Sequence, residues 1–201
     1  MNEMRFLASS ELKDARSEII RKSIHLLIAF SPGVAVVSRT FAIGILGAGV
    51  LLYTLFEVLR HWGIRVPVVS GLTSAVSRPR DSGRFVLGPV TLGAGAILAF
   101  IYFPPVAATV AVYALAFGDS AASLVGKFFG RIRPAFLCGK SIEGSFACFI
   151  VVYYAALIAS GSVNAAFVAA IDASLAEALP LDDFDNIVIP LAAGLAVSLV
   201  L

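Results

Sequence analysis

The segment Phe117–Ser145 concentrates the side chains that are best suited to chemistry. Its charged residues are Asp119, Lys127, Arg131, Arg133, Lys140 and Glu143, within one short hairpin of a strongly apolar sequence. Charge inside or beside membrane-spanning segments is costly, so an ion, a phosphate group or a catalytic step is the usual reason for it. We therefore expect this hairpin to carry the functional site.

Asp119 starts a polar stripe on a predicted helix, because Asp119, Ser123 and Lys127 recur every four residues. Small residues recur beside them with the same spacing, at Gly118, Ala122, Gly126 and Gly130. Such a small-residue face lets membrane helices approach closely. A carboxylate here suits Mg²⁺ binding or acceptance of a proton from an attacking hydroxyl. A purely structural Asp–Lys arrangement that holds the bundle together is the alternative.

Lys140, Ser141 and Glu143 begin the next apolar segment. Free backbone N–H groups and the helix dipole at such a start favour an anion. The alternative is helix capping, with Glu143 as an N-terminal acid.

Two further groups of polar residues lie far from the hairpin in sequence. Glu18, Arg21, Lys22 and His25 share one helical face, which is either a phosphate-binding face or a solvated one. Near the C-terminus, Glu177 ends an apolar segment, and Asp185 and Asn186 begin the last one.

The composition indicates an integral membrane protein. The 201 residues are 59% apolar and 14% charged, with a mean hydropathy of +0.95, against about 45–50% and 25% for soluble domains. The net charge of +2 is too small to argue for nucleic acid. Residues 1–23 are polar and lack the apolar core of a cleavable signal peptide, so we expect a short cytoplasmic amphipathic surface helix there.

Residues 24–201 are predicted to form a single transmembrane catalytic domain of the all-α class, a polytopic bundle of about seven helices. The predicted spans are His25–Val37, Phe41–Leu59, Phe85–Phe103, Val106–Gly126, Ser141–Ser160, Ser162–Leu179 and Ile187–Leu201. Pro32-Gly33 predicts a kink in the first span.

Basic residues alternate strongly between the two sides of these spans. They precede the first span and follow the second and the fourth. Arg65, Arg78 and Arg80 are among those that follow the second span. In the loops on the opposite side of the membrane, Arg39 is the only basic residue. The positive-inside rule then places the N-terminus in the cytoplasm. All the candidate residues above consequently converge near one surface, the cytoplasmic face of the cell membrane.

Several sequence blocks together resemble the CTP-dependent polyprenol kinase family, which includes dolichol kinases, phytol kinases and CTP-using diacylglycerol kinases. The matching blocks are Glu18-Ile-Ile-Arg-Lys-x-x-His25, Phe117-Gly-Asp-Ser-Ala-Ala-Ser-x-x-Gly126, Phe129-Gly-Arg131, Gly139-Lys-Ser-Ile-Glu-Gly-Ser145, and Glu177 followed by Asp185-Asn186-Ile-x-x-Pro190. The middle blocks are also similar to membrane phosphatidate cytidylyltransferases. Those enzymes carry a His-Gly-Gly run before Asp-Arg, which is absent from this sequence.

The resemblance implies transfer of the γ-phosphate of CTP to the hydroxyl of a polyprenol, a phytol-like alcohol or diacylglycerol. Catalytic roles then fall to Asp119, Lys140 and Glu143. Mg²⁺ would be held by Asp119, Glu143, Glu177 and Asp185. The nucleotide and its phosphates would be bound by Arg21, Lys22, His25, Lys127, Arg131, Ser141 and Asn186.

Two other functions compete with a lipid kinase. A phosphatidate cytidylyltransferase would use much the same charged hairpin but attack the α-phosphate. A small ion-coupled transporter would use intramembrane carboxylates such as Asp172, although such sites usually lie near the membrane midplane. The sequence leaves the acceptor lipid and homo-oligomerisation open.

Overall fold

The computed structural model describes residues 2–64 and 84–201, with side chains from residue 15 onward in those ranges. These residues form helices and contain no strand, in agreement with the predicted all-α class. Arg65, Arg78 and Arg80, on which the predicted orientation partly rests, lie outside the described residues. The main helices are α1 (Asn2–Leu27), α2 (Ser31–Val37), α3 (Arg39–His61), α5 (Gly88–Tyr102), α6 (Pro105–Tyr113), α7 (Asp119–Phe129), α8 (Ile142–Ser160), α9 (Val163–Ala178) and α10 (Asp185–Val200).

Each predicted span after the first coincides with a helix or a helix pair to within a few residues, whereas the first begins inside the longer helix α1. Among the described residues, five stretches are long and apolar enough to cross a membrane: Ala15–Val37, Arg39–His61, Pro105–Phe129, Ile142–Ser160 and Asp182–Val200. Helices α5 and α9 have 15 and 16 residues, fewer than the roughly 20 that a full span needs. The count of seven spans and the orientation therefore stay predictions.

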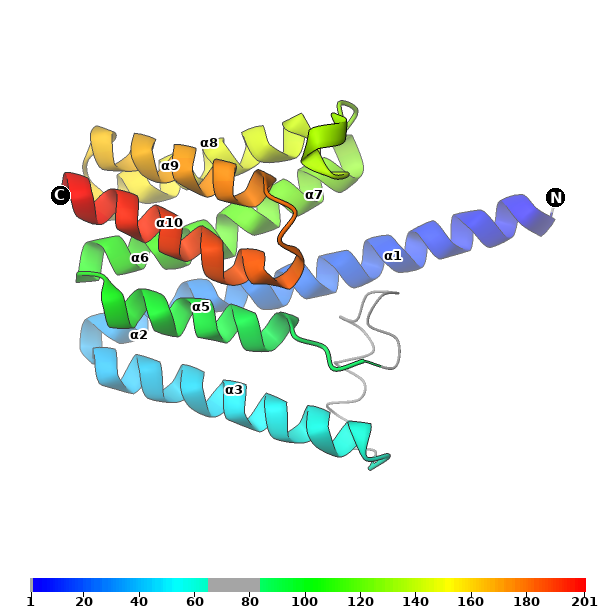
Figure 1. The fold of residues 1–201 in the computed structure, drawn as a ribbon, viewed down its shortest axis with the longest axis horizontal. Helices are drawn as coiled ribbons and strands as arrows, with labels where there is room; N and C mark the ends of the chain where they lie inside the picture. Colours follow the sequence, from blue (N-terminus) through cyan, green and yellow to red (C-terminus); the bar gives the residue numbers. More distant parts are fainter. Residues whose placement is uncertain (1, 65–83) are drawn as a thin grey trace.

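The N-terminal helix differs from the short surface helix that the sequence suggested. Helix α1 runs for 26 residues and continues past the expected boundary at residue 23 into the first span. Its distal half extends beyond the bundle (Figure 1). A 3₁₀ turn, Ile28–Phe30, separates α1 from α2, and Pro32 lies in the first turn of α2, where a missing N–H costs little. The kink predicted at Pro32-Gly33 stays a prediction, because the irregular turn lies before these two residues.

Small residues set the distance between α7 and α8. The buried residues of α8 recur every four positions, at Gly144, Cys148, Val152 and Ala156. A Cβ atom added to Gly144 would lie 2.7 Å from the carbonyl oxygen of Ala122 on α7, so only glycine permits this approach. The small-residue stripe predicted for the fourth span is therefore the face that packs on α8.

The chain returns repeatedly to one end of the bundle. Figure 1 shows the outer half of α1, the C-terminal end of α3, the start of α5 and the α7–α8 and α9–α10 connections toward that end. The C-terminus and the α2–α3, α5–α6 and α8–α9 connections lie toward the other. This topology brings polar residues from distant parts of the sequence to one place.

Candidate active site

A cavity of about 410 Å³, hereafter the polar cavity, gathers most of the candidate residues. Its charged lining residues are Glu18, Arg21, Asp119, Lys127, Arg133, Lys140, Glu177, Asp182 and Asp185. These four cations and five carboxylates come from α1, α7, α9, α10 and the two connections α7–α8 and α9–α10. Neutral lining includes Ser123, Gly126 and Ser141. The convergence expected from the sequence is thus seen in the structure.

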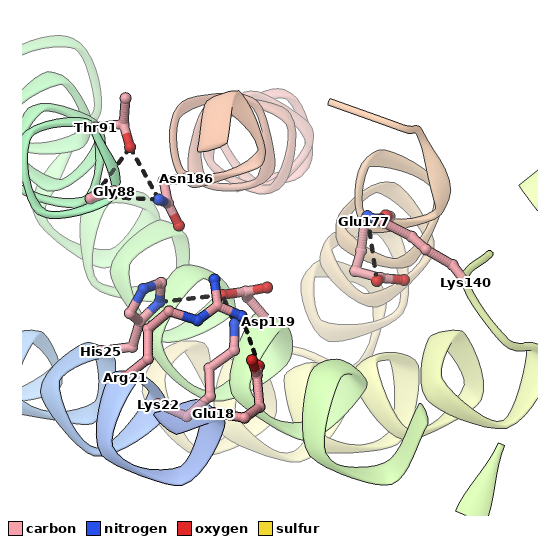
Figure 2. A network of polar contacts seen from close by, with 10 residues as sticks. All are labelled: Glu18, Arg21, Lys22, His25, Gly88, Thr91, Asp119, Lys140, Glu177 and Asn186. Atoms are coloured by element: carbon pink, nitrogen blue, oxygen red, sulfur yellow. Dashed lines mark hydrogen bonds and ion pairs between the residues drawn. The ribbon is translucent and has the colours of Figure 1, made fainter. Parts of the chain in front are cut away.

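Asp119 anchors one side of the polar cavity, where it is held by two residues of α1. The Lys22 ammonium group donates a hydrogen bond to Asp119 Oδ2 and forms an ion pair with it. His25 Nδ1 lies 3.1 Å from the same oxygen. Figure 2 shows both side chains reaching from α1 toward Asp119. Both contacts are made by the same carboxylate oxygen, Oδ2.

Lys22 and His25 themselves are almost fully buried, at 1% and 4% exposed, and neither lines the polar cavity. Of the predicted phosphate-binding face of α1, Glu18 and Arg21 line the cavity, and they form an ion pair at 2.6 Å. The face therefore divides into a pair that supports Asp119 and a pair that lines the cavity.

A π-helical segment, η3 (Ala114–Gly118), directly precedes Asp119 and joins α6 to α7. A π turn adds one residue to the turn, so the faces of α7 are rotated relative to those of α6. This rotation agrees with two neighbouring contacts that face different helices. Gly118 packs against Val152 of α8, and Asp119 accepts a hydrogen bond from Lys22 of α1. Such π segments occur frequently at functional sites.

Lys140 and Glu177 form the opposite side of the polar cavity. The Lys140 ammonium group donates to the backbone oxygen of Glu177 and lies 3.4 Å from its Oε1. Ser145 Oγ donates to Glu177 Oε2 at 3.0 Å. Figure 2 shows this pair across from Asp119 and Arg21. The Glu177 carboxylate is thereby fixed between α8 and α9.

Glu143 takes a position that the sequence did not foresee. Its Oε1 accepts hydrogen bonds from the backbone N–H groups of Arg131 and Ile132, at 3.0 and 3.1 Å, and the residue does not line the polar cavity. Arg133 braces the same connection, because its guanidinium group donates to the backbone oxygens of Gly126 and Gly139. Together they fix the path of the α7–α8 connection.

Ser141 caps helix α8 and lies at the polar cavity. Its hydroxyl accepts a hydrogen bond from Gly144 N at 3.1 Å, so it is the N-cap of α8, and it also lines the polar cavity.

Asn186 and Arg131 lie away from the polar cavity. The amide nitrogen of Asn186 donates to Thr91 Oγ1 at 2.9 Å and ties α10 to α5 (Figure 2). Arg131 is exposed on the α7–α8 connection. Neither arrangement supports the nucleotide contact expected for these residues. Conversely, Arg133 and Asp182 line the cavity although sequence reasoning did not select them. No spacing signal pointed to either, since their placement depends on the course of two loops.

The four carboxylates expected to hold Mg²⁺ do not assemble into one cage. Within residues 15–64 and 84–201, no three His, Cys, Asp or Glu side chains lie close enough together to bind an ion by themselves. Two of the four carboxylates already have other partners. Glu143 accepts hydrogen bonds from the backbone of the α7–α8 connection, and Asp119 forms an ion pair with Lys22. Asp119, Glu177 and Asp185 nevertheless line the same cavity.

The fold and the cavity define a membrane-type helix bundle with a charged cavity at one end. Comparison with known proteins adds one similarity. A protein named CTP-dependent diacylglycerol kinase 1, from Eremothecium gossypii, is 32% identical over 98 residues. The match covers 48% of this chain and 31% of the relative, so it spans less than a third of the relative's length. No protein-family model and no solved structure matches the chain.

Proposed function

We propose that this chain is an integral-membrane, CTP-dependent lipid kinase of the polyprenol kinase family. The observation that carries the proposal is the polar cavity itself, which places four cations and five carboxylates at one end of an apolar bundle. A site that binds a nucleoside triphosphate together with a divalent cation needs positive side chains for the phosphates and carboxylates for the metal ion. The similarity to a CTP-dependent diacylglycerol kinase supports the reaction class and the donor.

The cations of the cavity are suited to the triphosphate. Arg21, Lys127, Lys140 and Arg133 come from three separate parts of the chain and line one space. Hydrogen bonds from such groups to phosphate oxygens are charge-assisted and about twice as strong as neutral ones. Phosphoryl transfer depends mainly on positioning and charge neutralisation, which this arrangement supplies.

The carboxylates of the cavity fit Mg²⁺ in the way that nucleotide enzymes usually bind it. Mg²⁺ is commonly held by one or two carboxylates together with substrate phosphates, so an all-protein cage is not needed. Asp119, Glu177 and Asp185 would hold it here. When bound, the ion neutralises charge on the phosphate oxygens. Glu143 is left out of this set because its carboxylate accepts backbone hydrogen bonds.

In the proposed reaction, the lipid hydroxyl oxygen forms a bond to the γ-phosphorus. The bond from that phosphorus to the bridging oxygen breaks, CDP leaves, and the hydroxyl proton passes to a carboxylate of the cavity. Asp119 serves either as this base or as a metal ligand, and both roles need its carboxylate form, which the Lys22 charge stabilises. Following the basic residues, we assign the cavity to the cytoplasmic side of the cell membrane.

A cytidylyltransferase acting on phosphatidic acid would use the same cavity and attack the α-phosphorus. The transport alternative is less well supported. Asp172, its best residue, does not line the polar cavity, whose lining includes residues of the α7–α8 and α9–α10 connections.

Labelled CTP separates these functions. Purified protein in detergent is given Mg²⁺, a panel of polyprenol, phytol, diacylglycerol and phosphatidic acid, and CTP labelled at either the γ- or the α-phosphate. Label that reaches lipid only from the γ position supports the kinase, and the mobility of the product identifies the acceptor. Label from the α position alone would establish the cytidylyltransferase instead. No transfer from CTP or ATP would favour transport.

A further inference from the structure

The α7–α8 connection carries exposed apolar side chains as well as the charged side chains that line the polar cavity. Four large apolar side chains in and beside it, hereafter the apolar rim, are at least half exposed: Phe128, Phe129, Ile132 and Phe136. Phe129 and Phe136 reach 71% and 77%. Moving a phenylalanine side chain out of water is worth about 1.5–3 kcal/mol, so a rim of this kind requires a cover.

The apolar rim continues an exposed stripe of α8. The large exposed side chains of α8 recur every four residues: Ile142, Phe146, Ile150, Tyr154 and Ile158. The stripe runs along a helix that is long and apolar enough to span the membrane. It joins the rim directly, because the backbone N–H of Ile142 donates to the Ile132 oxygen at 3.0 Å. One apolar surface therefore extends along α8 onto the loop.

The same connection also lines the polar cavity, through Arg133, Cys138, Gly139 and Lys140, whereas none of the four rim residues lines it. The exposed Arg131 lies between the rim residues Phe129 and Ile132. Apolar side chains such as phenylalanine next to arginine are typical of interfacial segments, whose apolar face is buried at the boundary between acyl chains and head groups while the cation meets lipid phosphate. This composition favours a bilayer over a second protein as the cover.

We infer that the apolar rim is inserted into the acyl–head-group boundary of the bilayer that surrounds the bundle. The polar cavity, which the same connection lines, then lies at head-group depth. An acceptor hydroxyl reaches the cavity laterally, as part of a lipid that stays in the membrane. The lateral supply rests on the proposed function, whereas the membrane contact does not.

Tryptophan fluorescence measures the depth of the rim. Trp62 is the single native tryptophan, so F136W and F129W are each made in a W62F background. The full chain is reconstituted in phosphatidylcholine vesicles brominated either near the head group or near the chain ends. Both rim tryptophans are expected to be quenched about twofold more by the shallow bromines. Y154W, in the middle of the α8 stripe, is the matched control and is expected to respond more to the deep ones.

Two outcomes would overturn the inference. Quenching of both rim tryptophans by aqueous iodide, without any effect of brominated lipid, would place the loop in water. Protection from both quenchers would mean that protein covers the rim, as in a complex with a second copy. These measurements need no nucleotide, so they stand apart from the kinase assay. Rim insertion without label transfer from CTP would retain the membrane contact and reject the kinase.

Surface dilution tests the lateral route. The acceptor lipid is held at fixed bulk concentration while inert phospholipid is added to the vesicles. Lateral supply predicts that the initial rate falls in proportion to the mole fraction of acceptor in the membrane. A rate that follows bulk concentration alone would show that the acceptor arrives from water.

Discussion

Lys22 of α1 and Asp119 of α7 form an ion pair inside the bundle although 97 positions separate them in the sequence. Only 1% of Lys22 and 3% of Asp119 is exposed. Two charges withdrawn from water in this way need each other, since the desolvation penalty of either one alone amounts to several kcal/mol. The pair therefore joins the N-terminal helix to the helix that begins with the main candidate catalytic residue.

Removal of one partner should destabilise the fold more than removal of both. K22M leaves the Asp119 carboxylate buried beside His25 only, and we expect a loss of about 3–5 kcal/mol in the free energy of unfolding. K22M/D119N should recover most of that loss, because neither buried charge remains. Unfolding of the single and double variants in detergent, followed by circular dichroism, measures the difference. A K22M protein as stable as the parent would show that the pair contributes little.

The double variant also isolates the chemical role of Asp119. K22M/D119N should fold and yet transfer no γ-phosphate, with a loss of about 100-fold or more, because the carboxylate needed for metal binding or proton transfer is gone. Gel filtration confirms the folded state, and the labelled CTP assay gives the rate. Near-normal turnover in this variant would remove Asp119 from the site.

Lys140 should matter more for nucleotide use than a cation at the other end of the bundle. We expect K140A to raise the KM for CTP by about tenfold, the worth of one lost charge-assisted hydrogen bond. R39A is the control, because Arg39 donates to the Phe103 oxygen at 3.1 Å, away from the polar cavity. Equal effects of the two substitutions would contradict the placement of the nucleotide.

Glu143 is expected to position the α7–α8 connection rather than to bind metal. In E143Q the side-chain carbonyl can still accept the hydrogen bonds from Arg131 and Ile132, so the Mg²⁺ concentration that gives half-maximal rate should stay within about twofold of the parent value. E143A removes the acceptor and should lower the rate further. Titration with Mg²⁺ distinguishes the roles, since a tenfold higher metal requirement in E143Q would return Glu143 to the metal site.

Cys138 reports on occupancy of the polar cavity without any measurement of activity. It is exposed and lines the cavity, whereas Cys148 is buried between helices. A maleimide should label Cys138 alone, and Mg²⁺ with CTP should slow that labelling at least about fivefold, as expected at a free nucleotide concentration several times Kd. C138S provides the blank. Labelling that is unchanged at saturating CTP would place the nucleotide elsewhere.

The amino-acid sequence by itself determined the class of this protein and the helices that follow α1, whereas the full length of α1 was not foreseen. Apolar stretches of span length, such as Phe41–Leu59, can satisfy their backbone only as helices in a membrane, so their positions are read directly from composition. The stripe of Gly118, Ala122 and Gly126 likewise identified a packing face, because four-residue spacing is a local property of a helix.

Only the tertiary structure decided which charges share a cavity. Lys22 supports Asp119 from another helix, and Asn186 binds Thr91 instead of facing the site, and both pairings depend on how distant segments pack. Arg133 reaches the cavity while Arg131, two positions away, does not, because a loop follows no period from which side-chain direction can be predicted. Helical periodicity fixes neighbours within one helix, whereas the partners of a charge across helices are fixed by packing and by the cost of leaving it unpaired.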